Sequence, residues 1–248
     1  LKAKYGKGTL VADGNVSLVL PFPKININAK AENVFFPLLK KSNLVFSGEV
    51  NLKGEKLPYI LGGNINILHG EILDEVSEFT AGSSAATDFD RFIPVEKLED
   101  KLDFVQYKLG LDILTPIPIK NGLADIRIDG TTQVRGILLN PRLVGEFKIV
   151  PALSKFVFKG HEFILSEGKI IFDGDGPKIN PIVGFTGIAK VKDWDIKLAV
   201  NGRADKVSID FASDPPTLSQ NDILSLLTIG ITQDISKDIG EGDRQNVA

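Results

Sequence analysis

The sequence contains no cysteine and no methionine, and only two histidines occur among its 248 residues. The lack of cysteine excludes disulfides, thiolate nucleophiles and thiolate metal sites, although it does not assign a cellular compartment. Because a complete gene product starts with methionine, the first residue, Leu1, is expected to be an internal position. We therefore expect both ends to be cuts in a longer chain.

The sequence also has little net charge and no long apolar run. Its 29 lysines and arginines nearly balance 32 aspartates and glutamates, and the two signs are interspersed. This excludes the basic stripe that nucleic-acid binders need. No apolar stretch approaches the roughly 18–20 residues of a membrane helix, so we expect any membrane anchor to lie outside these residues. The length fits one large or two small folded units.

What the sequence does contain is an alternation of apolar and polar residues with a period of two. A strand with one dry and one wet face produces this pattern. Pairs such as Asp129-Gly130, Lys159-Gly160 and Glu167-Gly168 are typical of turns, and such pairs recur at roughly 8–12 residues. We therefore predict an all-β protein with a long antiparallel curled sheet that forms a groove, and the alternative is a closed β-sandwich. The alternation occurs in residues 16–20, 44–52, 59–73, 124–129, 145–149, 194–198 and 207–211.

Two stretches interrupt the alternation. Residues 74–103 are charged and rich in Ser and Ala, and they predict a mobile loop with a possible short helix at 95–102. Near the end, Ser219 and Asp222 resemble a capping box, and apolar residues follow at helical spacing up to Gly230. The predicted organisation is an N-terminal β-groove segment at 1–73, the loop at 74–103, a β domain ending in a helix at 104–230, and a flexible tail at 231–248.

Residues with catalytic or metal-binding chemistry are few. His69 and His161 each adjoin a glycine and lack HExxH spacing, so we interpret them as solvent-facing turn histidines. Residues 173–176, Asp-Gly-Asp-Gly, predict a hairpin turn rather than a calcium loop, because the closing glutamate of such a loop is missing. Asp88 and Asp90 fall in the loop as solvated acids. The sequence therefore predicts no enzyme, no cofactor and no metal site.

The remaining unusual feature is apolar strand surface with almost no helix to cover it. A sheet must bury one face, either against itself or against a ligand in an open trough. Covering about ten methylenes of an acyl chain would provide roughly 8 kcal/mol before ordering costs. If the trough is open, its candidate lipid-contacting residues are Ile126, Ile128, Phe147, Ile149, Phe156, Phe158, Ile170, Phe172, Trp194, Ile196, Leu198, Val207, Ile209 and Phe211.

One segment resembles a known family. Residues 213–230, SDPPTLSQNDILSLLTIG, are similar to the TamB C-terminal domain, a relative of the AsmA-like bridging proteins. They share a Pro-Pro-Leu-Ser start, an acidic residue, Ile-Leu-Ser-Leu-Leu and a closing glycine. The chain departs from this pattern by the added Thr217 and by Ile229, where Phe is common. The resemblance covers about 123–230 well, and residues before Asp74 match only in their general succession of strands and turns.

The resemblance implies a periplasmic protein with an inner-membrane anchor and an apolar β-groove that moves phospholipid toward the outer membrane. It also implies a TamA-like outer-membrane barrel as partner. Three functions stay open, namely a lipid conduit, a chaperone-like module that pairs with client strands by β-augmentation, and a passive spacer. For the helix, Ser219, Leu224 and Leu227 are candidates for a cap or gate, and the alternative is a plug that only covers the sheet end.

Overall fold

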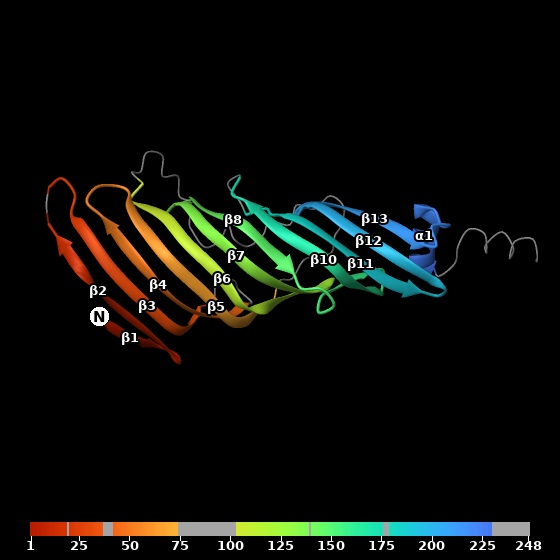
Figure 1. Ribbon diagram of the computed structural model, residues 1–248, viewed down its shortest axis with the longest axis horizontal. Helices are drawn as coiled ribbons and strands as arrows, with labels where there is room; N and C mark the ends of the chain where they lie inside the picture. The colour runs from red at the N-terminus through yellow and green to blue at the C-terminus, as the bar shows by residue number, and fades with distance from the viewer. Residues whose placement is uncertain (19, 37–41, 74–102, 139, 176–178, 230–248) are drawn as a thin grey trace, which may run out of the picture.

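The computed structural model describes residues 1–18, 20–36, 42–73, 103–138, 140–175 and 179–229. Across these residues the chain forms one sheet of thirteen strands and one helix. Figure 1 shows the strands crossing a long axis obliquely, with β1 at one end and α1 at the other. The elements are β1 (Lys2–Tyr5), β2 (Gly8–Ser17), β3 (Lys24–Phe36), β4 (Ser42–Gly54), β5 (Tyr59–Leu73), β6 (Val105–Lys120), β7 (Ala124–Ile137), β8 (Asn140–Ile149), β9 (Lys155–Phe158), β10 (His161–Asp173), β11 (Ile182–Val191), β12 (Trp194–Arg203), β13 (Lys206–Asp214) and α1 (Gln220–Ile229).

The sheet follows chain order from β1 to β13, except that β9 lies off this path and pairs with β10 and β7. This confirms the predicted all-β curled sheet, and the sheet is not a closed barrel. One pair differs from the expected antiparallel order, because β5 and β6 run parallel, with Tyr59 beside Val105. Parallel neighbours need a long crossover, and the intervening 74–102, with the predicted loop and short helix, lie outside the described residues. The tail lies outside them too, and the division into domains stays a prediction.

The sheet curls strongly at its C-terminal end. The rings of Phe158 in β9 and Phe211 in β13 have centroids 5.1 Å apart. Strands β10, β11 and β12 lie between them in the sheet order. In a flat sheet, four strand spacings of about 4.8 Å would separate β9 from β13 by about 19 Å. The sheet therefore bends until side chains from distant strands meet on one face, which we call the inner face.

Irregularities in the strand register accompany the bending. The register shifts between β3 and β4, β4 and β5, β5 and β6, and β6 and β7, and the shifts lie next to one another across the sheet. A β-bulge bends its strand and increases the local twist. A further bulge in β10 lies between Leu165 and Glu167. The irregularities thus follow one line across strands β3 to β7.

Two of the predicted turns and one predicted strand are wrong. Asp129-Gly130 lies inside β7 rather than in a turn, and Glu167-Gly168 lies at the bulge of β10. A side chain at Gly168 would collide with Phe185 on the inner face, so the glycine serves close packing. The strand predicted at 16–20 ends at Ser17. The chain turns there toward Pro21, which has no N–H to donate to a ladder.

The close packing of neighbouring strands predicts that alanine substitution at two glycines changes the free energy of unfolding by very different amounts. Gly70 in β5 has φ of +139°, and a Cβ there would meet the carbonyl oxygen of Asn43. Gly122 lies between β6 and β7 with open space around it. We expect Gly70→Ala to lower the free energy of unfolding by about 2 kcal/mol or more, and Gly122→Ala to change it by less than about 0.5 kcal/mol. Chemical denaturation measures both, and equal effects would contradict the described packing.

Candidate functional site: the inner face of the sheet

All fourteen residues predicted to line a groove lie on the inner face and belong to two packed clusters. The structure also shows which side chains of β11 face inward. Phe185 is buried, whereas Ile182 and Ile188 point outward and are exposed. Contact of the fourteen residues with lipid stays a prediction. The buried ones are Ile128, Phe147, Ile149, Phe156, Ile196 and Leu198, and the half-buried ones are Ile126, Phe158, Ile170, Phe172, Trp194, Val207, Ile209 and Phe211.

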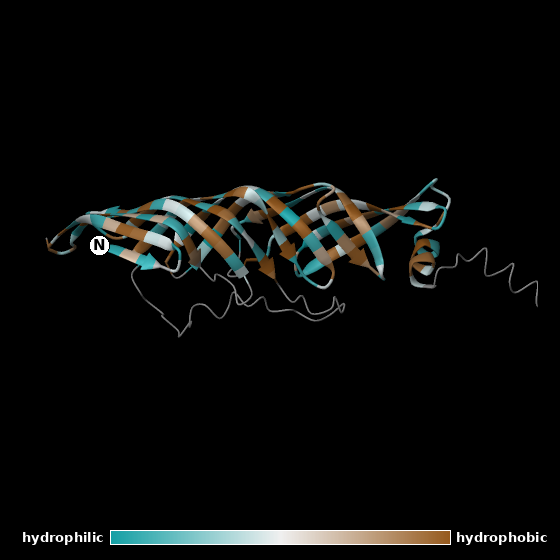
Figure 2. Cartoon of the chain, turned by 90° about the horizontal axis from the view of Figure 1, so that it is seen from below, coloured by the Kyte–Doolittle hydropathy of each residue, from teal (hydrophilic) through white to brown (hydrophobic). Residues whose placement is uncertain are grey.

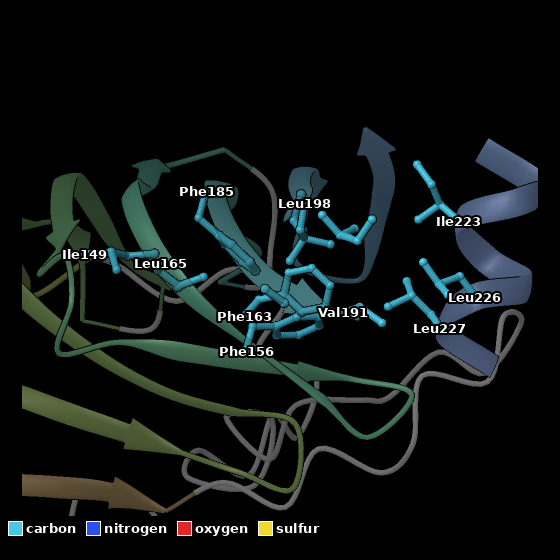
Figure 3. Close-up of a cluster of buried hydrophobic side chains, with 13 residues drawn as sticks. Ile149, Phe156, Phe163, Leu165, Phe185, Val191, Leu198, Ile223, Leu226 and Leu227 are labelled. Carbon is cyan, nitrogen blue, oxygen red and sulfur yellow. The ribbon is translucent and has the colours of Figure 1, made fainter. Parts of the chain in front are cut away.

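Strands β8–β13 and the helix contribute the C-terminal cluster (Figure 3). Its side chains fill the space inside the curl by touching one another. Phe163 and Phe211 lie 6.1 Å apart between ring centroids, and Phe156 and Phe185 lie 5.5 Å apart. Phe163 and Ile196 are fully buried, with no exposed surface. The cluster consists of Ile149, Phe156, Phe163, Leu165, Phe185, Ala189, Val191, Ile196, Leu198, Val200, Ile223, Leu226 and Leu227.

Helix α1 covers the end of this cluster. Figure 3 shows Ile223, Leu226 and Leu227 directed toward the side chains of the sheet, and all three are buried. The predicted capping arrangement is present. The Asp222 N–H donates to Ser219 Oγ at 3.3 Å, and the Ser219 N–H donates to the Asp222 carboxylate at 3.3 Å. These bonds satisfy donors that a helix start otherwise leaves free.

Two further contacts hold the helix against the sheet. His161, the first residue of β10, places its Nε2 3.2 Å from the carbonyl oxygen of Leu227. In the segment before the helix, Ser213 Oγ accepts from the Leu218 N–H and donates to the Pro215 carbonyl. His161 is therefore a half-buried partner of the helix rather than a solvent-facing turn residue. His69 is exposed, but it lies within β5 and not in a turn.

The middle cluster occupies the inner face from β4 to β10. Phe147 and Phe172 pack edge to face there, with ring centroids 5.7 Å apart. The sheet is covered at this point by large side chains from neighbouring strands. The buried members are Leu44, Phe46, Ile67, Ile113, Ile117, Ile128 and Phe147.

The N-terminal inner face, on strands β2–β5, is different, and the sequence-based groove set contained none of its residues. Its side chains are apolar, but they are half-buried or exposed; Leu10 keeps 38% of its surface and Val16 keeps 53%. Three of them are alanines, and Gly48 and Gly63 lie on the same face. The signal in the sequence was the alternation of 25–31, Ile-Asn-Ile-Asn-Ala-Lys-Ala. We call the set Leu10, Ala12, Ile25, Ile27, Ala29, Ala31, Val50, Leu52, Leu61 and Ile65 the N-terminal trough.

The opposite face of these strands is polar. Asn51 Nδ2 donates to the side-chain oxygens of Asn26 and Asn28 at 3.0 and 2.6 Å, and so links β4 to β3. Lys30 lies close to Glu32 and Glu49, and the hydrogen bonds with these carboxylates raise the pKa of its amine. The outer face of these strands is thus hydrated, and Figure 2 shows apolar and polar residues alternating along the strands of the sheet.

An ion pair lies where strands β10 and β12 end. Arg203 donates to the Asp173 carboxylate and to the Asn180 carbonyl. The hydrogen bond from Arg203 holds the pKa of Asp173 below its usual value. Asp173 thus serves an ion pair, and among the described residues no cluster of three or more His, Cys, Asp or Glu side chains could hold a metal. Asp88 and Asp90 lie outside the described residues.

Comparison with known proteins gives one match. Residues 1–247 match the sequence model of the TamB C-terminal domain, which extends the resemblance from the C-terminal half to nearly the whole chain. TamB proteins are non-enzymatic bridging or assembly components that are anchored in the inner membrane and span the periplasm. No curated protein matches significantly. In the part of the chain that the structure describes, no helix has the length and apolarity to cross a membrane.

The burial of α1 predicts unequal effects of two leucine substitutions. Leu227 is buried against the C-terminal cluster, whereas Leu224 is only half-buried. We expect Leu227→Ala to lower the free energy of unfolding by about 2–5 kcal/mol, because it leaves a cavity in a packed site. Leu224→Ala should cost less than half as much. Chemical denaturation tests this, and a larger loss at Leu224 would mean that the helix packs with another face.

The ion pair at the sheet edge predicts a pH dependence. Because the pKa of Asp173 is lower in the folded protein than in the unfolded chain, the pair stabilises the fold above the unfolded pKa of about 3.9. That stabilisation is lost as the pH falls through the folded pKa. We expect Arg203→Gln to return the pKa of Asp173 toward its usual value, as measured by NMR titration of the carboxyl carbon. An unchanged pKa would exclude Arg203 as the cause.

Proposed function

Because this chain belongs to the TamB C-terminal domain family, which serves in the translocation and assembly module with an outer-membrane partner, we propose that it carries phospholipid between the two bacterial membranes. Acyl chains lie against the inner face of the sheet, and headgroups stay in water at its edges. The partner at the outer membrane is a TamA-like barrel. No bond is made or broken in this role, so it needs no catalytic residue.

The N-terminal trough is the observation that supports this proposal most. It keeps apolar side chains partly exposed on the inner face, while asparagines and ion pairs occupy the outer face. An acyl chain needs only such a surface, because each methylene removed from water contributes about 0.8 kcal/mol. The trough residues of β3, from Ile25 to Ala31, span about 20 Å, more than the roughly 15 Å depth of one bilayer leaflet. A whole acyl chain therefore fits along the trough.

A second function is supported by a different observation. The sheet is open, and among the described residues β1 and β13 each have a single strand neighbour along its path. A free strand edge offers unpaired backbone groups to a partner strand. A chaperone-like module that helps assemble outer-membrane proteins would use these edges, whereas a lipid carrier would use the inner face. Crosslinks from an edge strand to a client protein would favour the chaperone role.

Charge substitution at neighbouring residues separates the lipid role from a purely structural one. Leu52 points into the trough between Ile27 and Leu61, and Lys53 points outward. We expect Leu52→Glu to reduce the phospholipid that co-purifies with the protein several-fold, because a carboxylate resists burial against an acyl chain. Lys53→Glu should leave the amount unchanged.

Mass spectrometry of an organic extract, scaled to protein, gives the lipid content of each variant. Circular dichroism and the midpoint of denaturation confirm that both variants fold. A lipid-free wild-type protein, or an equal loss in the two variants, would contradict the proposed function.

A further inference from the structure

We infer that acyl chains bind only on the N-terminal trough, and that strands β9–β13 with α1 form a closed end that lipid does not enter. The inference rests on the proposed function and deepens it, because it assigns the binding segment within one continuous apolar face. It also reverses the role of the aromatic side chains in the C-terminal half. They occupy the inside of the curl instead of lining it for a ligand.

Side-chain size supports this assignment. The strand register places small residues side by side on the inner face of the N-terminal strands. Ala12 of β2 pairs with Ala29 of β3, which faces Val50 of β4 and then Gly63 of β5. A neighbouring row places Ala31 beside Gly48. Residues of this size do not reach across a curled sheet and leave the neighbouring row of Ile27, Leu52 and Leu61 half-buried, so apolar surface stays accessible there.

The C-terminal strands show the opposite arrangement. Leu198 of β12 pairs with Phe211 of β13, and Phe211 reaches both Phe158 and Phe163 across the curl. Leu165, Ile196 and Leu198 have at most 1% of their surface exposed. Within the described residues, every aromatic contact joins strands from β8 onward. These side chains already cover one another.

Binding of an acyl chain at the closed end would therefore bring no favourable free energy. An acyl chain on the N-terminal trough replaces water on apolar surface, which is favourable. An acyl chain between β9 and β13 would have to separate side chains that already touch, exchanging one apolar contact for another and leaving ring surfaces poorly packed. It would also have to displace α1 and its contact with His161. Lipid on the sheet therefore stays on the N-terminal trough and does not reach β9.

Site-specific photocrosslinking of the full chain tests this assignment. A benzophenone amino acid replaces Ile27 or Leu52 in the trough, and Phe158 or Phe211 at the closed end, where the aromatic replacement disturbs packing least. Asn28 and Asp210 are exposed, outward-facing controls. Each variant is irradiated with vesicles of phosphatidylethanolamine and phosphatidylglycerol, and lipid adducts are quantified by mass. We expect adducts at positions 27 and 52 at least tenfold above Asn28, and adducts at positions 158 and 211 at the level of Asp210.

A second measurement leaves the closed end unmodified. Trp194 is the single tryptophan and packs against the C-terminal cluster. Phospholipids with brominated acyl chains quench tryptophan on contact, so the wild-type protein should show no quenching. A variant that combines Trp194→Phe with Leu52→Trp should be quenched strongly. This comparison stands even where a benzophenone at position 158 or 211 prevents folding.

The outcomes distinguish the two proposals. Adducts at positions 158 and 211 as strong as those at 27 and 52, or quenching of Trp194, would overturn the closed end while leaving lipid carriage intact. Adducts at none of the four inner positions, together with no quenching in either protein, would overturn lipid carriage and the closed end with it. Adducts confined to positions 27 and 52 support both.

Discussion

The structure depends on one constraint, namely that the apolar face of a single-layer sheet must be kept from water without a second layer. The protein meets this constraint differently along its length. In the C-terminal strands the sheet curls until large side chains such as Phe158 and Phe211 meet, and α1 covers the remaining opening. On the N-terminal trough, rows of alanine and glycine separate the larger side chains, and the apolar surface stays partly exposed. Side-chain size along one alternating pattern thus separates a packed core from an apolar surface that stays partly exposed.

The segment that carries the family resemblance is the segment that closes the sheet. Residues 213–230 begin with Ser213, whose hydroxyl fixes the turn into the helix, and continue with Ser219, which caps it. Ile223, Leu226 and Leu227 then fill the end of the C-terminal cluster. The pattern Pro-Pro-Leu-Ser to Ile-Leu-Ser-Leu-Leu therefore has a structural explanation that requires no contact with a ligand or partner.

Strands and helix could be predicted because each depends on local sequence. The alternation at 59–73 and the capping pair at Ser219 determine their elements from a few neighbouring residues. The bulges could not be predicted, since glycines within strands, such as Gly130 and Gly168, carry the same signal as glycines in turns. For the candidate site, the sequence could predict which residues share the inner face but not how accessible they are. Aromatic content pointed to the C-terminal strands, but accessibility depends on whether opposite residues touch, and that follows from the curl rather than from any single strand.

The parallel pairing of β5 and β6 has a consequence for assembly. All the other strand pairs in the described part of the sheet are antiparallel, and most are joined by a short connection. The strands before and after this parallel pair can therefore form two separate sets of hairpins. Their union at β5 and β6 pairs residues that are distant in the chain, a step that topology makes slow. Until β5 and β6 pair, each set of hairpins has a strand edge with unpaired backbone donors and acceptors. The β5–β6 pair therefore forms by the same backbone recognition that a strand from another polypeptide would use.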